Sequence, residues 1–269
     1  MKTMILKNRY RLLLRVSVIV ALIVAIKLVI HFLAWEVISI NPLFSGIIAA
    51  NVFLMGFLLN GVLTDFKESE RLPGELAASL ETLAQEVRGI KLAKPDANIF
   101  AFLQHLSQLS QNVLIWFHKK HRTSALLEDL NELTPHIAVM EQWTQATLVA
   151  RLKQEQSNLR RIIIRIHTIR DTSFISSGYL LADIITVFLC LGLILVKIEP
   201  FFESIFFVII ISYFIVFLLM LIRDLDNPFG YYDHSSGEDV PLKPIEDALG
   251  RLTQLANAEV TPLKNGFDQ

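Results

Sequence analysis

The stretch Leu43–Thr64, which reads LFSGIIAANVFLMGFLLNGVLT, is 22 residues long and contains no ionisable side chain. An α-helix needs about 20 predominantly apolar residues to cross the roughly 30 Å of hydrocarbon in a bilayer. The stretch therefore predicts a transmembrane helix, and the rest of the sequence has to be interpreted with a bilayer as its surroundings.

Three further segments have the same length and apolar character: Leu12–Trp35, Phe174–Ile198 and Phe201–Ile222. The first of them is too long for a signal peptide, and no small-residue cleavage site follows it. Only the short links Glu36–Pro42 and Lys197–Pro200 join neighbouring spans. The expected fold class is an all-α membrane protein with four transmembrane helices in two hairpins and an intervening helical cytoplasmic block.

The composition supports a membrane protein and excludes several other classes. Of the 269 residues 53% are hydrophobic, whereas about 45–50% is usual for soluble domains. The net charge of −1 gives no indication of nucleic acid as a partner. The single cysteine, Cys190, excludes a disulfide within the chain and a cysteine-type zinc site.

Basic residues near the spans predict the orientation in the membrane. The N-terminal segment carries Lys2, Lys7, Arg9, Arg11 and Arg15, whereas the first link has no basic residue. Fourteen Lys or Arg lie between the second and third spans, but only Lys197 lies in the last link. Because basic loops stay in the cytoplasm, both termini and the central block are expected on the cytoplasmic side. The expected location of the protein is a cell membrane or an inner membrane.

Four regions are expected along the chain. They are the basic segment with the first hairpin over 1–65, the helical block over 66–171, the second hairpin over 172–223 and a cytoplasmic tail over 224–269. Apolar residues of the block recur at helical spacing in Leu76, Leu80, Leu83 and Val87.

Local signals predict where helices of the block begin and end. Breaks are expected at Pro73-Gly74, at Lys94-Pro95-Asp96 and at Thr134-Pro135. Asp96 is a candidate N-cap, and Thr123 is a candidate helix start. One long helix is expected from Val139 to Ile169 and continuing into the third span, and one short helix of the tail around Ile245–Ala256.

One face of the second span differs from the other. At about 100° per residue, one line carries small, aromatic or polar side chains: Gly46, Ala49, Phe53, Phe57, Asn60 and Thr64. The opposite side is aliphatic: Ile47, Ile48, Leu54, Met55, Leu58, Leu59 and Val62. This pattern has two explanations. Small residues on one face favour close packing against another helix, whereas a face that lines a pore can carry aromatic rings as a hydrophobic constriction.

Three ionisable residues lie within the spans: Lys27 and His31 in the first, and Asp183 in the third. Such residues are costly in lipid and usually face the interior of the bundle or water. The favoured interpretation is that Lys27 pairs with Asp183 or extends outward and holds helices together. The alternative is that these groups set the electric field along a permeation path.

The sequence gives no indication of an enzyme or of a cofactor. It contains no glycine-rich phosphate loop, no nucleophile elbow and no His-Glu-x-x-His motif. His118 and His121 are spaced i, i+3, but a solvated basic helix end explains them better than a metal site, which would need two more ligands.

Three short motifs resemble the bestrophin family of anion channels. Arg223-Asp-Leu-Asp-Asn-Pro-Phe-Gly230 is similar to the acidic-Asn-Pro-Phe-Gly motif that ends the family's fourth helix, and Glu238-Asp-Val-Pro-Leu242 to the Asp-Leu-Pro-Leu segment that follows it. Arg170–Tyr179 resembles the entry to the third span, without its prolines. Phe57–Phe66 resembles the second span, whereas Asp65–Pro73 departs from the family's Arg-Trp-Trp-Glu-type stretch.

The resemblance implies a homopentamer in membrane lipid, with an axial pore lined by the second span and permeated by anions such as chloride. The family's neck of three apolar residues at i, i+4 and i+8 corresponds to Ala49, Phe53 and Phe57, and Gly46, Asn60 and Thr64 continue the pore stripe. The helix-end motif corresponds to Asp226, Asn227, Pro228, Phe229 and Gly230. The alternative is a non-conducting membrane scaffold or sensor whose cytoplasmic helices bind a partner.

Animal members of the family bind calcium through acids beside this motif. The acids of this chain are scattered instead, at Asp224, Asp226, Asp233, Glu238 and Asp239, and Tyr231-Tyr232 interrupt them. A solvated acidic tail is therefore favoured over a calcium site, and no metal is assigned.

Overall fold

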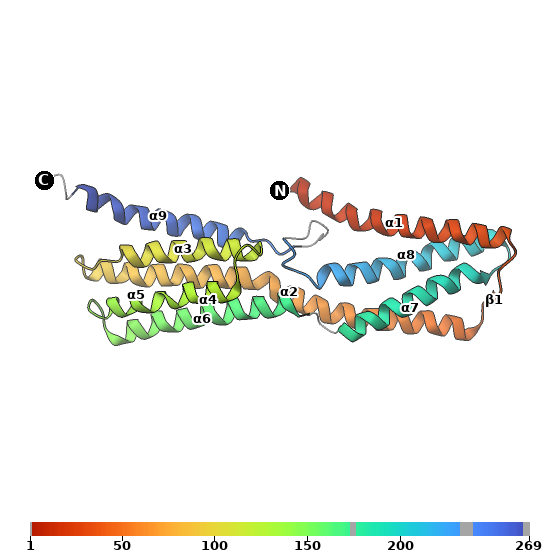
Figure 1. Ribbon diagram of the computed structural model, residues 1–269, viewed down its shortest axis with the longest axis horizontal. Helices are drawn as coiled ribbons and strands as arrows, with labels where there is room; N and C mark the ends of the chain where they lie inside the picture. Colours follow the sequence, from red (N-terminus) through yellow and green to blue (C-terminus); the bar gives the residue numbers. More distant parts are fainter. Residues whose placement is uncertain (1, 173–175, 232–238, 266–269) are drawn as a thin grey trace. The chain divides into compact units, whose positions relative to one another are not determined.

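The computed structural model describes residues 2–172, 176–231 and 239–265, and these ranges form nine helices and two very short strands (Figure 1). The helices are α1 (Lys2–Phe32), α2 (Pro42–Ala93), α3 (Phe100–Phe117), α4 (Thr123–Asn131), α5 (Leu133–Met140), α6 (Ala146–Asp171), α7 (Ser176–Leu195), α8 (Phe201–Leu225) and α9 (Lys243–Asn265). The strands are β1 (Ile38–Ser39) and β2 (Val196–Lys197). The predicted all-α class is confirmed.

The chain divides into two compact units. The first, here called the membrane unit, contains α1, α7, α8, both strands and the part of α2 up to Lys67. The second, here called the helical block, contains α2 from Glu68 onward together with α3 to α6 and α9.

The described residues include four helical segments that are long and apolar enough to cross a membrane. Their most apolar windows have mean hydropathies of 2.0 to 3.2, and at most 28% of each window is buried within the protomer. The remaining apolar surface faces outward, which a protein in water would not tolerate at this extent. The chain is therefore an integral membrane protein.

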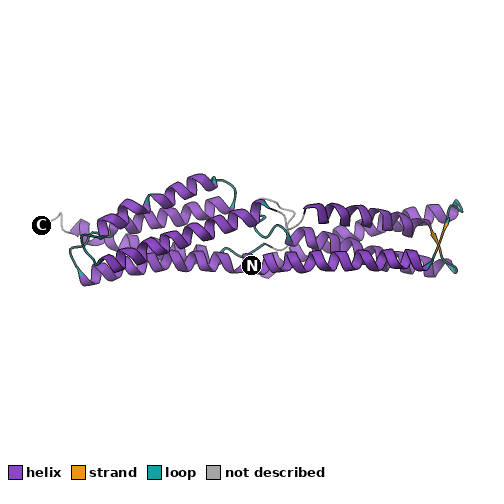
Figure 2. Cartoon of the chain, turned by 90° about the horizontal axis from the view of Figure 1, so that it is seen from below, coloured by secondary structure: helices purple, strands orange, loops and turns teal. Residues whose placement is uncertain are grey.

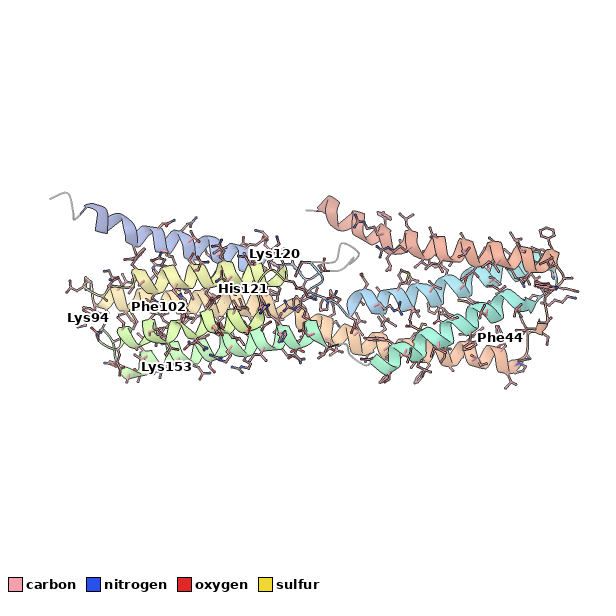
Figure 3. The ribbon with its side chains drawn as sticks, in the orientation of Figure 1. Phe44, Lys94, Phe102, Lys120, His121 and Lys153 are labelled. Atoms are coloured by element: carbon pink, nitrogen blue, oxygen red, sulfur yellow. The ribbon has the colours of Figure 1, made fainter. Side chains whose placement is uncertain are left out.

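The core of the membrane unit lies between α2, α7 and α8. Its buried residues are Met55, Leu58 and Val62 of α2, Ala182 and Leu189 of α7, and Ile215, Ile222 and Leu225 of α8. α1 packs on α8 through Val16, Val20 and Val216. Phe44, labelled in Figure 3, lies so close to α7 that a Cβ atom on Gly192 would be 2.7 Å from its ring. Glycine at this position therefore leaves room for the Phe44 ring against α7.

The two hairpin links are joined to each other by a small parallel sheet (Figure 2). Ile38 pairs with Val196, and Ser39 pairs with Lys197. Because each strand has only two residues, no alternation of apolar and polar side chains could have predicted it.

The helical block has an apolar core of its own. Leu76, Leu80, Leu83 and Val87 of α2 are all fully buried, which confirms the predicted amphipathic helix. α9 packs on α3, and Ser107 and Thr253 of these helices form a hydrogen bond of 3.0 Å. The carboxylate of Glu81 on α2 accepts hydrogen bonds from Arg251 of α9.

The predicted break at Pro73-Gly74 is wrong, because α2 continues through Pro73 to Ala93. A proline inside a helix costs about 3 kcal/mol or more. Burial of one Leu or Val side chain contributes about 1.5–3 kcal/mol, and the four fully buried residues that follow Pro73 offset this cost. The break at Lys94-Pro95 is confirmed, since α2 ends at Ala93.

Other predicted boundaries in the block and the tail also need correction. The helix expected from Val139 to Ile169 is interrupted after Met140, and α6 begins only at Ala146. Asp96 is not the N-cap of α3, which is Ile99. The tail helix α9 is 23 residues long, longer than the short helix expected around Ile245–Ala256. Thr123 does begin α4 as predicted.

Candidate functional site

The stripe residues of α2 are all exposed on the protomer. Gly46, Ala49, Asn60 and Thr64 are exposed, and the two rings between them are exposed by 78% at Phe53 and 56% at Phe57. A stripe that packed against the other helices of its own chain would be buried. The stripe is therefore available to water, to lipid or to another protomer.

The opposite side of α2 attaches the helix to its own protomer. Met55, Leu58 and Val62 are at most 1% exposed and contact α7 and α8. They recur at i, i+3 and i+7, which places them on one side of the helix. Of the seven residues expected on this side, only Ile47 is exposed. Aliphatic packing on this face thus fixes the direction in which the stripe points.

A buried ion pair lies where α1 meets the hairpin links. The Lys27 ammonium is completely buried and donates to the Glu36 carboxylate at 2.5 Å. It also donates to the carbonyl oxygen of Val196 in β2. His31 Nδ1 lies 3.0 Å from the second carboxylate oxygen of Glu36, and its ring stacks on Phe201 at a centroid distance of 3.6 Å.

The charge state of Glu36 follows from these contacts. Burial by itself raises the pKa of the Glu36 carboxyl, but the hydrogen bonds and charges of Lys27 and His31 outweigh burial and hold the pKa below its usual range. The Glu36 carboxyl is therefore ionised at neutral pH. The Lys27–Glu36 pair links α1, the first link and β2, and so acts as a clamp between the two hairpins.

The predicted partner of Lys27 is wrong. Asp183 pairs with Arg223 of α8 instead, and Lys27 does not extend outward. The sequence did contain a signal for the correct partner, because Glu36 is the only acid in the first link and follows the end of the span directly. Pairing of Lys27 with an acid of the adjacent link keeps both charges near the membrane surface, where desolvation is less costly.

The structure brings two of the resembling motifs together. The hydroxyl of Tyr179, from the entry to the third span, donates to the Asp226 carboxylate at 2.7 Å. α8 ends at Leu225, directly before the helix-end motif. Within the motif Pro228, Phe229 and Gly230 are buried, and Phe229 is completely inaccessible. Asp226 is thus held by a neighbouring helix rather than left in a solvated acidic run.

Arg170, the first residue of the motif that ends at Tyr179, lies in the helical block. Its guanidinium group is 4.6 Å from the centroid of the Trp116 ring, and it donates to the Trp116 carbonyl oxygen at 3.2 Å. Trp116 Nε1 donates to Thr123 Oγ1 at 3.0 Å. Stacking and hydrogen bonding of this kind anchor the end of α6 to α3 and α4.

No group of three metal-ligating side chains is present among the described residues. His121, labelled in Figure 3, contacts the Asp129 carboxylate at 3.1 Å. His118 Nδ1 contacts the carbonyl oxygen of Leu114, so the two histidines do not converge. Asp233 and Glu238 of the acidic tail lie outside the described residues.

The sequence alone matches no protein-family model and no curated protein. The fold, in contrast, is similar to that of solved structures. A bacterial bestrophin homologue from Klebsiella pneumoniae aligns with a TM-score of 0.72 at 17% identity, over 92% of this chain and 98% of that chain.

A substituted form of the Klebsiella pneumoniae protein aligns with a TM-score of 0.70 at 18% identity, over 93% of this chain and 99% of that chain. A further chain described as a membrane protein reaches a TM-score of 0.75 at 17% identity, over 88% of this chain and 97% of that chain. The likeness thus extends over both the membrane unit and the helical block, and the chain has the bestrophin-like fold of these bacterial homologues.

Proposed function

We propose that this protein is an anion channel, conducting chloride passively through a pore that is lined by α2 of several identical protomers. The observation that carries the proposal is the exposure of Ala49, Phe53 and Phe57 on a helix whose other side is firmly packed. The bestrophin-like fold supports it, because it supplies the same helix order as a family of anion channels.

The chemistry of the stripe suits a hydrophobic gate. Small side chains at Gly46 and Ala49 precede the two rings, and polar side chains at Asn60 and Thr64 follow them. Apolar constrictions control conduction by dewetting. The edge of a phenyl ring carries partial positive charge, so rings directed edge-on into a pore favour a partly dehydrated anion over a cation.

A pore of this kind requires several copies of the chain. One protomer contributes only one exposed face of α2, and rotation about an axis places the same face of every copy around a common space. The resemblance to the bestrophin family favours five copies. The pentamer is therefore part of the proposal.

Wild-type protein in chloride-loaded liposomes should release chloride when an external anion gradient is applied. The release should exceed that of empty liposomes and should scale with the amount of assembled oligomer. A chloride electrode measures it directly. Assembled oligomers that release no more chloride than empty liposomes would contradict the channel and favour the scaffold or sensor.

The proposed orientation places the helical block and both termini in the cytoplasm. On a Cys190→Ser background, a cysteine at Ser39 in β1 and one at Ala146 in α6 should react with a membrane-impermeant maleimide from opposite sides of sealed vesicles. Both positions are exposed in the protomer. Labelling of both from the same side would disprove this topology.

A further inference from the structure

The membrane unit has a hollow on its outer surface, between α1 and α8. It has a volume of about 410 Å³ and is lined by Leu14, Arg15, Val18, Ile19 and Met220. Deeper in the same seam the helices touch, because Val16, Val20 and Val216 are buried against one another. The hollow is therefore a local groove above a packed contact between the two helices.

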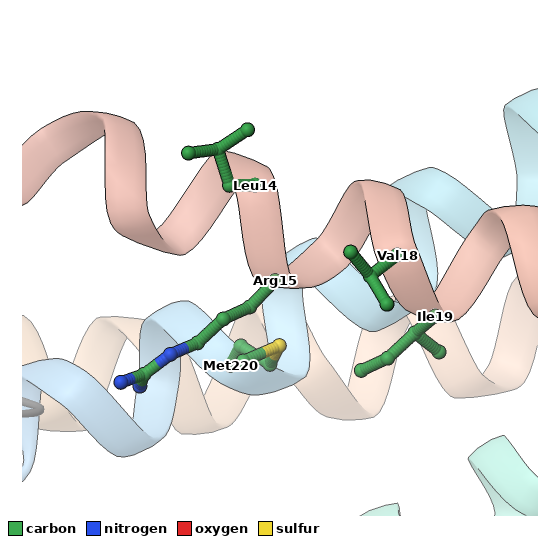
Figure 4. A pocket seen from close by; sticks show the side chains of 5 residues that line it. All are labelled: Leu14, Arg15, Val18, Ile19 and Met220. Carbon is green, nitrogen blue, oxygen red and sulfur yellow. The ribbon is translucent and has the colours of Figure 1, made fainter.

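Among the described residues that line the groove, four are apolar and one, Arg15, is charged. Figure 4 shows Arg15 beside Met220, with its guanidinium group directed toward the N-terminal end of α1, while Val18 and Ile19 lie farther along the helix. An apolar groove that is left unfilled loses the dispersion contacts of its lining. A flexible hydrocarbon chain restores these contacts, and a charged headgroup fits beside the arginine.

The depth of Arg15 agrees with such a ligand. Arg15 is the last of the five basic residues at this end of α1, and the eleven residues that follow it carry no ionisable side chain. Such a change from basic to apolar sequence is typical of the boundary between lipid headgroups and acyl chains. Since arginine keeps its charged end toward the interface while its stem lies in hydrocarbon, the guanidinium group of Arg15 is placed at phosphate level.

We propose that this groove binds an anionic phospholipid, with one acyl chain between α1 and α8 and the phosphate at Arg15. The first fifteen residues contain five basic side chains and no acidic one, which favours a lipid with net negative charge over a zwitterionic one. The proposed orientation places this end of α1 in the cytoplasmic leaflet, where anionic lipids are concentrated. The inference rests on that orientation and is independent of whether the protein conducts.

Two substitutions separate the contribution of the Arg15 charge to lipid binding from the contribution of the apolar groove. Arg15→Gln removes the charge and keeps the apolar walls, whereas Val18→Trp fills the groove. Val18 is 70% exposed, and Val29, which is 57% exposed, lies three turns away on the same face of α1. Val29→Trp is therefore the matched control for added bulk. Arg88→Gln, in the helical block, is the matched control for the loss of one positive charge.

Native mass spectrometry of the purified full chain, with added phosphatidylglycerol or phosphatidylcholine, measures the lipid retained per protomer. Wild type and both controls should prefer phosphatidylglycerol by about fivefold, the effect of one basic residue near a membrane surface. Arg15→Gln should lose this preference, and Val18→Trp should lose retention of both lipids.

Three outcomes would overturn the proposal. Unchanged preference in Arg15→Gln would show that the charge binds no headgroup, and equal retention by Val18→Trp and Val29→Trp would show that no chain lies in the groove. A change in the number of protomers per particle in Val18→Trp, with lipid retention intact, would identify the groove as a contact between copies of the chain.

Discussion

Replacing Glu36 with glutamine should destabilise the membrane unit by about 3–5 kcal/mol, because the substitution leaves the Lys27 ammonium buried without a counter-charge. Lys27 is fully buried and its other acceptor is the neutral carbonyl oxygen of Val196. The melting temperature of the detergent-purified protein should fall by roughly 10 °C. Thermal unfolding followed by tryptophan fluorescence measures this shift.

A second substitution should recover much of the loss. Lys27→Met combined with Glu36→Gln removes both charges, and replacement of a whole buried pair by uncharged side chains is often close to neutral. Lys197→Met is the matched control, because it breaks the neighbouring pair with Glu199, in which both side chains are largely exposed. This control should leave the melting temperature almost unchanged. A double variant as unstable as Glu36→Gln would show that the charge balance of the clamp is not what stabilises the unit.

The clamp should also respond to acid in a defined direction. Its contacts hold the pKa of Glu36 below the usual value. The contribution of the Glu36 carboxylate to the free energy of unfolding is therefore complete at neutral pH, which lies above the pKa of this group in the unfolded chain. The contribution is then lost as the pH falls through the depressed value. Because Glu36→Gln lacks this titration, its melting temperature should fall less between pH 6 and about pH 3 than that of wild type.

Phe53→Ala and Phe57→Ala should each raise chloride flux through the reconstituted oligomer severalfold. Each substitution removes one ring per protomer from the proposed constriction, which widens it and makes it easier to wet. Both rings are exposed on the protomer, so their removal leaves the packed side of α2 intact. Flux per oligomer, measured with a chloride electrode and normalised to reconstituted protein, tests the expectation.

Two controls separate a pore effect from a packing effect. Leu58→Ala truncates a buried residue on the packed side, so it should cost about 2–5 kcal/mol and leave flux per folded oligomer unchanged. Phe202→Ala removes an equally exposed ring from the start of α8 and should change neither property. If both stripe variants assemble normally and stay as impermeable as empty liposomes, the rings do not form a gate.

The membrane spans were predictable because they depend on local properties of the sequence. Uninterrupted apolar length is sufficient to identify a span, and each of the four expected segments overlaps a helix described by the structure. The first and third expected segments each run three residues past the end of the helix, and residues 174–175 lie outside the described residues. The division of α2 into an exposed and a packed side was also visible, since helical periodicity separates Phe53 and Phe57 from Met55 and Leu58.

Features that depend on tertiary contacts were harder to predict. The partner of Lys27 is set by how the first link folds back, and a two-residue β1 gives no periodic signal for that geometry. Pro73 indicates a break by local rules, but the buried face that follows it outweighs those rules. The length of α9 depends on its contact with α3, and the sequence of the tail alone does not reveal this contact.

Single-particle electron microscopy of the purified full chain tests the central claim most directly, because it counts the protomers and shows what surrounds the stripe of α2. We predict five protomers around an axial water-filled pore, with Phe53 and Phe57 of every copy facing the axis. A monomer, or an oligomer in which these rings face lipid or a closed protein contact, would contradict the claim.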